Sequence, residues 1–455
     1  MGRKGDYPVG EPIISVSGLR GIVGETLTPE VAARYAAALA ALAPKGTIVI
    51  TRDGRASGVM LAGAILAALQ AVGRDTIDAG VAATPTTGVL VRTLGAAGGI
   101  QISASHNPAE YNGLKLFSHD GRVIPAGPGE KVLKQYRTGT IPWVTHDRLG
   151  TGQSCADSTS AHLQAVLPTV DVDRIRSRRF NVLLDSNHGA GSLLGRRLLE
   201  ALGCRLTILG EEPDGRFAHT PEPTAENLSG VLAAVTEAAA DIGFCQDPDA
   251  DRLAVIDETG RYVGEEYTVA MCVDHVLRQR KGPIVTNCST SRMSQDLARR
   301  YGVPFFHSAV GEANVVDAML EHDAVFGGEG NGGPIDPRVG LVRDSFVGMA
   351  QLLDAMAARE MRISQLADEL PRYEIVKTKI ALGGEKVPAA LDALERHFTD
   401  AKSDRLDGLR LDWPGRWLLV RASNTEPIVR AVAEAEAAAE ATRLCDEAAD
   451  VLSRL

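Results

Sequence analysis

The sequence lacks cysteine pairs, long apolar runs and a signal-peptide core. Its six cysteines are scattered over 455 residues and never form C-x-x-C, which is typical of a reducing compartment and a fold without disulfides. No run approaches the roughly 18 apolar residues of a membrane span, and the N-terminal stretch MGRKGDYPVGEPIISVSG has no apolar core. We therefore expect a cytoplasmic protein with no membrane partner.

An excess of basic residues is absent as well. The formal net charge is −10 at pH 7, whereas surfaces that bind nucleic acid are usually basic. The composition, 44% hydrophobic and 23% charged, is typical of a globular protein, and a chain of this length predicts about three or four domains. Nucleic acid is therefore not an expected partner, while the oligomeric state stays open.

A strand–turn–helix pattern occurs three times. Each copy has an apolar strand, a polar turn, an amphipathic helix and two further short strands. This alternation favours α/β layers with largely parallel pairing, and the repeat predicts three similar α/β domains in tandem, with mixed sheets. Chance recurrence of a common pattern is the alternative. The first strands of the three copies are Thr47–Thr51, Asn181–Asp185 and Pro283–Asn287.

The last part of the chain differs from the three copies. From Glu374, strands are interrupted by one helix-like segment, VPAALDALERHF, and joined by turns such as WPGR, before a final helix rich in Ala and Glu. This order predicts a C-terminal α+β domain with an antiparallel sheet. The predicted domains are residues 1–155, 156–257, 258–370 and 371–455.

Each of the three third strands ends in an unusual polar loop. The loops contain SASHNP in the first copy, DPDADR in the second and GGEGNGG in the third. Ligands of open α/β sheets bind at the carboxyl ends of the strands. Three similar domains could therefore present their loops to one central cleft.

The loop DPDADR carries carboxylates at alternate positions, Asp247, Asp249 and Asp251. In extended backbone these side chains share one face, and such a cluster predicts a hard cation, Mg²⁺ or Ca²⁺. An EF-hand loop that ends at Glu258 is the alternative. Position 6 of that loop is Arg252 instead of Gly, and the following LAVID predicts a strand instead of a helix, so we favour a tight metal-binding loop.

Ser105 of SASHNP is followed directly by His106. This histidine is a poor base for Ser105, because neighbours in an extended segment point to opposite faces, and the chain has no G-x-S-x-G elbow. A serine that carries phosphate needs a divalent cation and cationic side chains, and the chain offers both. We interpret Ser105 as a phosphate carrier and His106 as a group that orients it. A hydrolase nucleophile is the alternative.

Two further segments are suited to binding anions. Arg20 in SGLRG lies between glycines, where the backbone can approach a ligand. The segment RASNTEP follows an apolar strand and offers a guanidinium and hydroxyl groups in a turn, which is typical of a phosphate nest. Its polar residues are Arg421, Ser423, Asn424 and Thr425.

Together these segments resemble the α-D-phosphohexomutase family. The motifs follow the family's order over almost the whole chain: SGLRG, TRDGR, SASHNPAEYNGLKLF, DPDADR, GGEGNGG and RASNTEP. The resemblance implies four domains around a central cleft, Mg²⁺ as the metal and a small phosphosugar as the substrate. It also implies glucose 1,6-bisphosphate, or an equivalent sugar bisphosphate, as the activator.

The resemblance implies a role for each motif residue. The residues implied to hold the phosphoryl group and one Mg²⁺ are Ser105, Asp247, Asp249 and Asp251. Those implied to act with Ser105 at the reacting centre are Arg20, Lys115 and His106. The residues implied to bind the substrate are Arg252, Glu329, Asn331, Arg421, Ser423, Asn424, Thr425 and Arg430.

The reaction implied by the resemblance interconverts hexose 6-phosphate and hexose 1-phosphate through a phosphoserine and a bound 1,6-bisphosphate. The GNGG loop resembles the archaeal-type phosphoglucosamine mutase branch, so we favour glucosamine phosphate as the substrate. Mannose and glucose phosphates are the alternatives, and an inactive sugar-phosphate-binding protein is a remote one.

The chain departs from the family at two places. Gly333 stands where many relatives have a histidine, which leaves Lys115 or Arg20 as the general acid or base. His307 and Ala309 stand where Arg and Lys are frequent in the archaeal-type branch.

Overall fold

The computed structural model describes residues 10–15, 18–422 and 428–454. Among the helices of these residues, none is long and apolar enough to cross a membrane. The chain forms two compact units, each made of two segments. The first unit consists of Met1–Thr268 and Gly332–Ser364, and the second of Val269–Asn331 and Gln365–Leu455.

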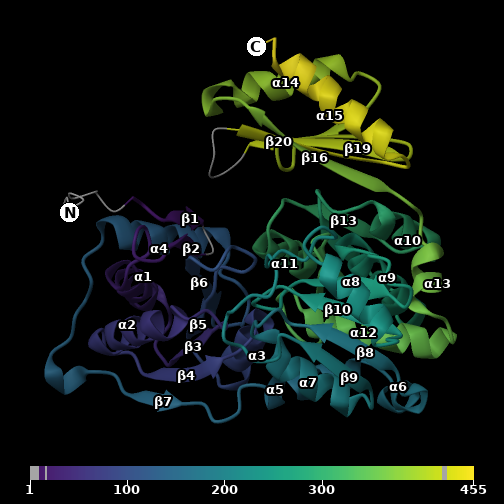
Figure 1. Ribbon diagram of the computed structural model, residues 1–455. Helices are drawn as coiled ribbons and strands as arrows, with labels where there is room; N and C mark the ends of the chain where they lie inside the picture. Colours follow the sequence, from purple (N-terminus) through teal and green to yellow (C-terminus); the bar gives the residue numbers. More distant parts are fainter. Residues whose placement is uncertain (1–9, 16–17, 423–427, 455) are drawn as a thin grey trace, which may run out of the picture. The chain divides into compact units, whose positions relative to one another are not determined.

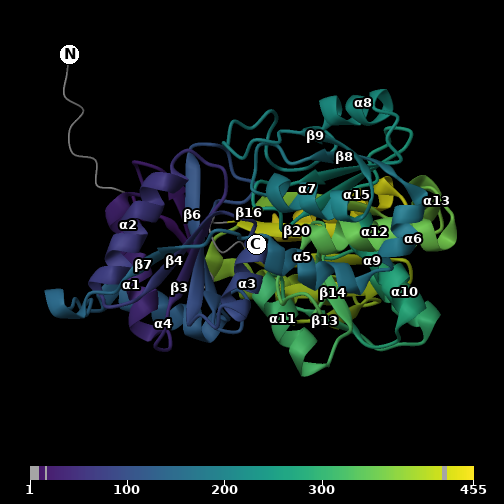
Figure 2. The same ribbon diagram turned by 90° about the horizontal axis from the view of Figure 1, so that it is seen from below.

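The first unit begins with a seven-stranded mixed sheet in the order β1-β2-β6-β5-β3-β4-β7. β3 pairs in parallel with β4 and β5, while β6 is antiparallel to β5 and β2. Helices α1 and α2 lie on one side of this sheet and α3 on the other (Figures 1 and 2). The strands are β1 (Ile13–Ser15), β2 (Gly18–Ile22), β3 (Ile48–Arg52), β4 (Thr76–Val81), β5 (Gly98–Ile102), β6 (Tyr111–Ser118) and β7 (Gly152–Ser154). The helices are α1 (Pro29–Leu42), α2 (Gly58–Ala71), α3 (Thr84–Thr93) and α4 (Ala126–Thr138).

A second, four-stranded sheet of this unit has the order β11-β10-β8-β9. β8 is parallel to β9 and β10, and β11 is antiparallel to β10. The buried helix α12 begins where the Asp344 carboxylate accepts hydrogen bonds from Phe346 N and Val347 N. The strands are β8 (Asn181–Asp185), β9 (Arg205–Leu209), β10 (Ile242–Gln246) and β11 (Leu253–Asp257). The helices are α5 (Ser160–Val166), α6 (Val172–Arg178), α7 (Gly191–Ala201), α8 (Ser229–Glu237) and α12 (Ser345–Arg359).

The second unit contains the third copy of the repeat. Its central strand β12 is parallel to both β13 and β14. The strands are β12 (Ile284–Asn287), β13 (Phe305–Ser308) and β14 (Phe326–Glu329), and β15 (Gly333–Ile335) comes next in the chain. The helices are α9 (Glu265–Gln279), α10 (Met293–Tyr301), α11 (Glu312–Glu321) and α13 (Ile363–Asp368). The predicted threefold α/β pattern is thereby confirmed.

The C-terminal sheet of the second unit is antiparallel throughout, in the order β16-β20-β19-β18-β17, which confirms the predicted α+β domain. Helices α14 and α15 cover one face of the sheet (Figure 1). From the other face, Trp417, Leu419 and Val432 pack on Cys288. The elements are β16 (Glu374–Ala381), α14 (Val387–His397), β17 (Lys402–Asp404), β18 (Leu409–Trp413), β19 (Arg416–Ala422), β20 (Ile428–Ala435) and α15 (Ala438–Leu452).

The strand β20 was not predicted from the sequence. Its text, IVRAVAEA, mixes β-branched residues, which favour strands, with alanines and a glutamate, which do not, so it gives no clear strand signal. Pairing with β16 on one side and β19 on the other determines its conformation, and Val429, Ala431 and Ala433 are buried in the core beneath the helices. Tertiary contacts therefore override the local preference at this position.

Candidate functional site

The loop between β5 and β6 places Ser105 at a tight turn in the first unit. Ser105 has a φ of 51°, a left-handed conformation that is uncommon for residues other than Gly, Asn and Asp. Arg55 of the TRDGR motif holds the loop, because its guanidinium donates to the backbone carbonyls of Ser105, Asn107, Pro108 and Tyr111 at 2.6–2.9 Å. Five N–H donors in a fixed plane suit this task, so the position of Ser105 within the site depends on one buried arginine.

Ser105 lies against a carboxylate of the second copy of the repeat. Its Oγ donates to Asp247 Oδ2 at 2.7 Å and lies 3.3 Å from His106 Nδ1. The expectation that the two neighbouring side chains diverge is therefore wrong, because the left-handed turn at Ser105 replaces extended backbone. Burial, with added repulsion from Arg252 and Arg20, lowers the pKa of His106 to about 2. The imidazole is therefore neutral near pH 7, and its role in orienting Ser105 stays a prediction.

The three aspartates of DPDADR converge. One carboxylate oxygen of each of Asp247, Asp249 and Asp251 lies within 4.8 Å of the others, as the sequence predicts. The loop is a tight turn, as the sequence analysis favours, with Ala250 at a φ of 55°. The carboxylates therefore converge through this turn and not through the alternation of side chains in extended backbone. The EF-hand alternative is excluded, because LAVID is strand β11 and Glu258 accepts a hydrogen bond from Ser364 Oγ at 2.5 Å.

Two of these aspartates are held through one oxygen each. Asp249 Oδ2 accepts hydrogen bonds from Thr84 Oγ1 at 2.5 Å and from Lys115 Nζ at 3.2 Å. Asp251 Oδ2 accepts from Lys115 Nζ and from Arg343 Nη2, both at 2.7 Å. The Oδ1 atoms of both aspartates are buried and have no hydrogen-bond partner within the described ranges. Buried polar atoms without partners are rare in folded proteins, so these two oxygens are candidates for coordinating a metal ion.

The electrostatics of the three aspartates favour a cation. Burial, followed by the charges of Asp249 and Asp251, raises the pKa of Asp247 far above its ordinary value. Burial would also raise the pKa of Asp249, but Lys115 and hydrogen bonds from Asp247 and Thr84 hold it below the ordinary value. A hard cation with oxygen ligands would offset this concentration of negative charge, so the aspartate cluster could bind a metal ion.

The predicted cations Arg20 and Lys115 come from neighbouring strands. β2 pairs with β6 so that Arg20 lies opposite Gly113 and Lys115 opposite Gly18. The Arg20 guanidinium donates to Asn107 Oδ1 at 3.2 Å in the Ser105 loop. Burial lowers the pKa of Arg20, and the positive charge of Arg252 adds to this effect while Asp249 opposes it. The first unit thus brings together Ser105, His106, the aspartate cluster and the predicted cations Arg20, Lys115 and Arg252.

The second unit holds Glu329 at the end of β14. The carboxylate is 5% exposed and its Oε1 accepts hydrogen bonds from Asn287 Nδ2 at 2.7 Å and from Gly311 N at 3.1 Å. Asn331, two residues further, has a buried Oδ1 without a hydrogen-bond partner in the described part of the chain. The loop after β14 therefore presents a fixed carboxylate and an amide oxygen that has no protein donor.

Two arginines of the C-terminal sheet lie side by side. Arg421 on β19 is directly opposite Arg430 on β20, and like charges at such positions destabilise a sheet unless an anion compensates them. Arg421 forms an ion pair with Asp407 at 3.1 Å, and Asp407 also accepts from Val310 N at 3.0 Å. Three predicted residues of this loop, Ser423, Asn424 and Thr425, lie outside the described residues.

Models of four consecutive domains of one family match the chain. They are described as phosphoglucomutase/phosphomannomutase alpha/beta/alpha domains I, II and III and the C-terminal domain, and they match residues 13–141, 160–260, 265–373 and 379–451. A "Phosphoglucomutase/phosphomannomutase" of Thermococcus kodakarensis is 37% identical over 427 residues, 92% of this chain and 93% of the relative. The chain belongs to the phosphoglucomutase/phosphomannomutase family.

Two further similarities extend over the whole chain. A "Probable phosphoglucosamine mutase" of Methanopyrus kandleri is 33% identical and the match covers 96% of this chain and 97% of that protein. A crystal structure of a phosphoglucomutase/phosphomannomutase family protein from Burkholderia thailandensis has a TM-score of 0.84 at 27% identity, covering 97% and 98% of the two chains. The protein is a phosphohexomutase, an isomerase that acts as an intramolecular phosphotransferase, which confirms the resemblance found in the sequence.

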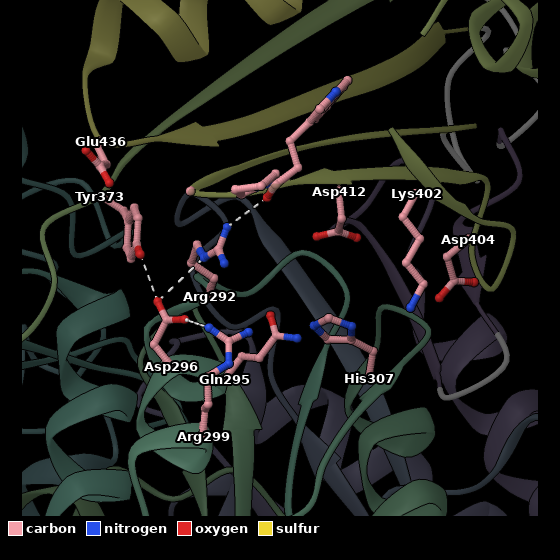
Figure 3. A pocket seen from close by; sticks show the side chains of 13 residues that line it. Arg292, Gln295, Asp296, Arg299, His307, Tyr373, Lys402, Asp404, Asp412 and Glu436 are labelled. Atoms are coloured by element: carbon pink, nitrogen blue, oxygen red, sulfur yellow. Dashed lines mark hydrogen bonds and ion pairs between the residues drawn. The ribbon is translucent and has the colours of Figure 1, made fainter. Parts of the chain in front are cut away.

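One cavity of this phosphohexomutase is lined by residues other than those predicted to bind substrate. It has a volume of about 690 Å³ and lies in the second unit, between α10 and β13 on one side and β17 and β18 on the other (Figure 3). Tyr373 OH donates to the Asp296 carboxylate at 2.8 Å, and Arg292 pairs with the same group at 3.5 Å. His307 lines this cavity, and burial lowers its pKa to about 3. Glu329, Asn331 and Arg421 are not among the lining residues.

Three residues of the phosphohexomutase site were missed in the sequence. Thr84, Arg343 and Asp407 each contact a predicted site residue. Thr84 lies 165 positions and Arg343 92 positions from its aspartate partner, and neither has a spacing or neighbour that marks it. Only the packing of distant segments identifies them.

Proposed function

We propose that this phosphohexomutase interconverts hexose 6-phosphate and hexose 1-phosphate, with Ser105 as the phosphate carrier and glucosamine phosphate as the preferred substrate. The observation that supports this proposal is the hydrogen bond of 2.7 Å from Ser105 Oγ to Asp247. It places a hydroxyl within the aspartate cluster, beside the cationic side chains of Lys115 and Arg20. A phosphoryl group on that oxygen would have a metal site and cations around it, which phosphoryl transfer requires.

Transfer proceeds in two halves. The bond between Ser105 Oγ and phosphorus breaks while phosphorus bonds to the free hydroxyl of the hexose phosphate. The leaving Ser105 oxygen takes up a proton and the sugar hydroxyl gives one up. Lys115 and Arg20, both cationic, are the candidates for the group that supplies the first proton and receives the second. The bound 1,6-bisphosphate then reorients, and its other phosphoryl group returns to Ser105. Between the two halves, Asp247 accepts the hydrogen bond of the free Ser105 hydroxyl and so keeps this oxygen in place.

The aspartate cluster, together with the phosphate on Ser105, would hold one Mg²⁺. The two buried Oδ1 atoms of Asp249 and Asp251 and the oxygen-only donor set suit this ion. When bound, Mg²⁺ would offset the negative charge of the transferring group. Glucose 1,6-bisphosphate or an equivalent sugar bisphosphate is the proposed activator, because it would restore the phosphoryl group to an unphosphorylated Ser105.

The remaining predicted residues would bind the sugar and its second phosphate. Glu329 would accept hydrogen bonds from ring hydroxyls, and Asn331 would contribute the polar oxygen described above. Arg421 and Arg430, adjacent across two strands, would bind the second phosphate; Arg252, Ser423, Asn424 and Thr425 complete the proposed set. The GNGG loop and the naming of the Methanopyrus relative as a probable phosphoglucosamine mutase favour glucosamine phosphate over mannose and glucose phosphates.

Intact-protein mass spectrometry tests the phosphate carrier. The wild-type chain, incubated with glucose 1,6-bisphosphate and Mg²⁺, should carry one phosphoryl group, and Ser105→Ala should carry none and lose turnover. Ser118→Ala, a change on β6 outside the aspartate cluster, serves as the control and should behave as the wild type. A wild-type chain without adduct, or an equal adduct on Ser105→Ala, would refute the carrier. Comparing turnover of glucosamine, mannose and glucose 6-phosphates then tests the substrate.

A further inference from the structure

Arg343 is a buried cation at the aspartate cluster to which the sequence assigned no role. It precedes α12, and its side chain is 9% exposed. Nη2 donates to Asp251 Oδ2 at 2.7 Å, on the same oxygen that Lys115 contacts at 2.7 Å. Its positive charge is close enough to Arg20 and His106 to contribute to lowering the pKa of both. The guanidinium is therefore part of the environment of Ser105.

Gly333 gives the Arg343 side chain its space. Gly333 is not among the residues with positive φ, so its backbone would accept any ordinary residue. A Cβ atom at this position, however, would lie 2.4 Å from Arg343 Cδ and 2.8 Å from its Cγ. These distances are far below van der Waals contact, and a side chain at 333 would displace the stem of the arginine. The glycine is required here by packing and not by backbone conformation.

We infer that Arg343 is a positioning residue for Asp251, and that Gly333 is a glycine because the stem of Arg343 occupies the adjacent volume. A free carboxylate can rotate about its Cβ–Cγ bond. Two cationic donors on Oδ2 fix that rotation and leave Oδ1, which has no hydrogen-bond partner among the described residues, as the oxygen available to a cation. Groups that orient a metal ligand in this way typically change metal affinity or activity by about 10- to 100-fold when they are removed. The inference rests on the proposed metal role of the aspartates.

The direction in which Mg²⁺ affinity changes when Arg343 is removed shows whether the residue acts by positioning Asp251 or by its charge. Arg343 carries a positive charge, so its removal would strengthen the binding of a cation if charge were its only contribution. If Arg343 orients Asp251, its removal weakens cation binding although the local charge becomes more negative. Measuring Mg²⁺ binding on its own therefore tests the role without any assay of turnover.

Isothermal titration of Mg²⁺ into the full-length, dephosphorylated chain is the primary experiment. The variant Arg343→Gln should bind Mg²⁺ about tenfold or more weakly than the wild type. Arg343→Lys, which keeps the charge and much of the stem, should recover part of that loss. The control is Arg338→Gln in the same segment, where the guanidinium pairs with Asp336 at 2.6 Å, and it should leave Mg²⁺ affinity unchanged. Circular dichroism verifies that each variant is folded.

A double-mutant comparison tests the role of Gly333. Gly333→Ala alone should weaken Mg²⁺ binding as Arg343→Gln does, because the new methyl group displaces the arginine. In an Arg343→Ala background, where the stem is gone, Gly333→Ala should add less than about a threefold further loss. If the losses of Mg²⁺ affinity caused by the two substitutions add in full, the side chain at position 333 does not compete with the stem of Arg343 for space.

The outcomes separate this inference from the proposed function. A wild-type chain that binds no Mg²⁺ overturns the metal role of the aspartates and this inference with it. A wild-type chain that binds Mg²⁺, with equal or tighter binding by Arg343→Gln, overturns only the positioning role of Arg343.

Discussion

Thr84 offers the sharpest test of how the metal loop is held in place. This residue begins α3, is fully buried, and contacts Asp249 twice: its backbone N donates to the Asp249 carbonyl at 2.9 Å, and its Oγ1 donates to Oδ2 at 2.5 Å. Thr84→Val keeps the size and shape of the side chain and removes only the hydroxyl. A hydrogen bond to a charged group contributes about 1.5–3 kcal/mol.

The expected loss of activity follows from that range. If the bond positions the carboxylate of Asp249 equally in the free enzyme and in the transition state, stability falls but turnover does not. If positioning is needed mainly in the transition state, 1.5–3 kcal/mol corresponds to a fall of about 10- to 150-fold in kcat/KM. Because Lys115 also contacts this oxygen, at 3.2 Å, the carboxylate is not left unpaired, and we expect a value near the lower end.

Steady-state turnover of glucosamine 6-phosphate at saturating Mg²⁺ and sugar bisphosphate is the assay. Thr84→Ser is the matched control, because it keeps the hydroxyl and loses one methyl group, which costs about 0.8 kcal/mol of burial and should change kcat/KM by less than about threefold. Wild-type kinetics and wild-type Mg²⁺ dependence in Thr84→Val would refute the reasoning.

Two further predictions concern Asp407 and His219. Asp407→Asn removes the ion pair of 3.1 Å with Arg421 and should raise KM for the phosphosugar about tenfold with a smaller change in kcat; an unchanged KM in steady-state kinetics would contradict it. Burial lowers the pKa of His219, but the hydrogen bond and charge of Asp185 outweigh it and bring the pKa above the ordinary 6.5. A histidine whose pKa is raised in the folded state contributes stability that is fully present below the ordinary pKa of 6.5. This contribution is lost as the pH rises through the pKa of the folded state. The stability advantage of the wild type over His219→Gln, measured by urea unfolding, should therefore shrink above pH 6.5; a constant advantage at all pH values would oppose it.

The repeat of strand, turn and helix was predictable because it depends on local patterns. Alternating apolar strands and amphipathic helices appear in the sequence as periodicity, and the structure has them at β3, β8 and β12. The antiparallel C-terminal sheet was predictable for the same reason, except for β20, whose alanines carry no strand signal of their own. Its two neighbouring strands supply the hydrogen bonds that the local sequence does not predict.

The left-handed residues in the loops that carry Ser105 and the aspartate cluster were not predictable. Both Ser105 and Ala250 have left-handed backbone, which is uncommon for these residue types. The sequence indicated a tight loop around the aspartates but not its left-handed residue, and at Ser105 it suggested an extended segment, in which Ser105 and His106 diverge. In the structure, Arg55 binds four carbonyls of one loop and Asp247 Oδ1 accepts from Arg252 N at 3.1 Å in the other, and these contacts stabilise the turns.

The sequence by itself determined the residue types of the site: a serine at a loop tip, three carboxylates in one short loop, and arginines near glycines. Their order along the chain was enough to indicate the family and its chemistry. Only the tertiary structure decided which oxygen of each aspartate is anchored and which is left for a ligand. It also decided that Arg343 fills the space beside Gly333. The first of these facts depends on side chains 92 to 165 positions apart, and even the second joins positions ten residues apart across a turn. Such contacts leave no local pattern in a single sequence.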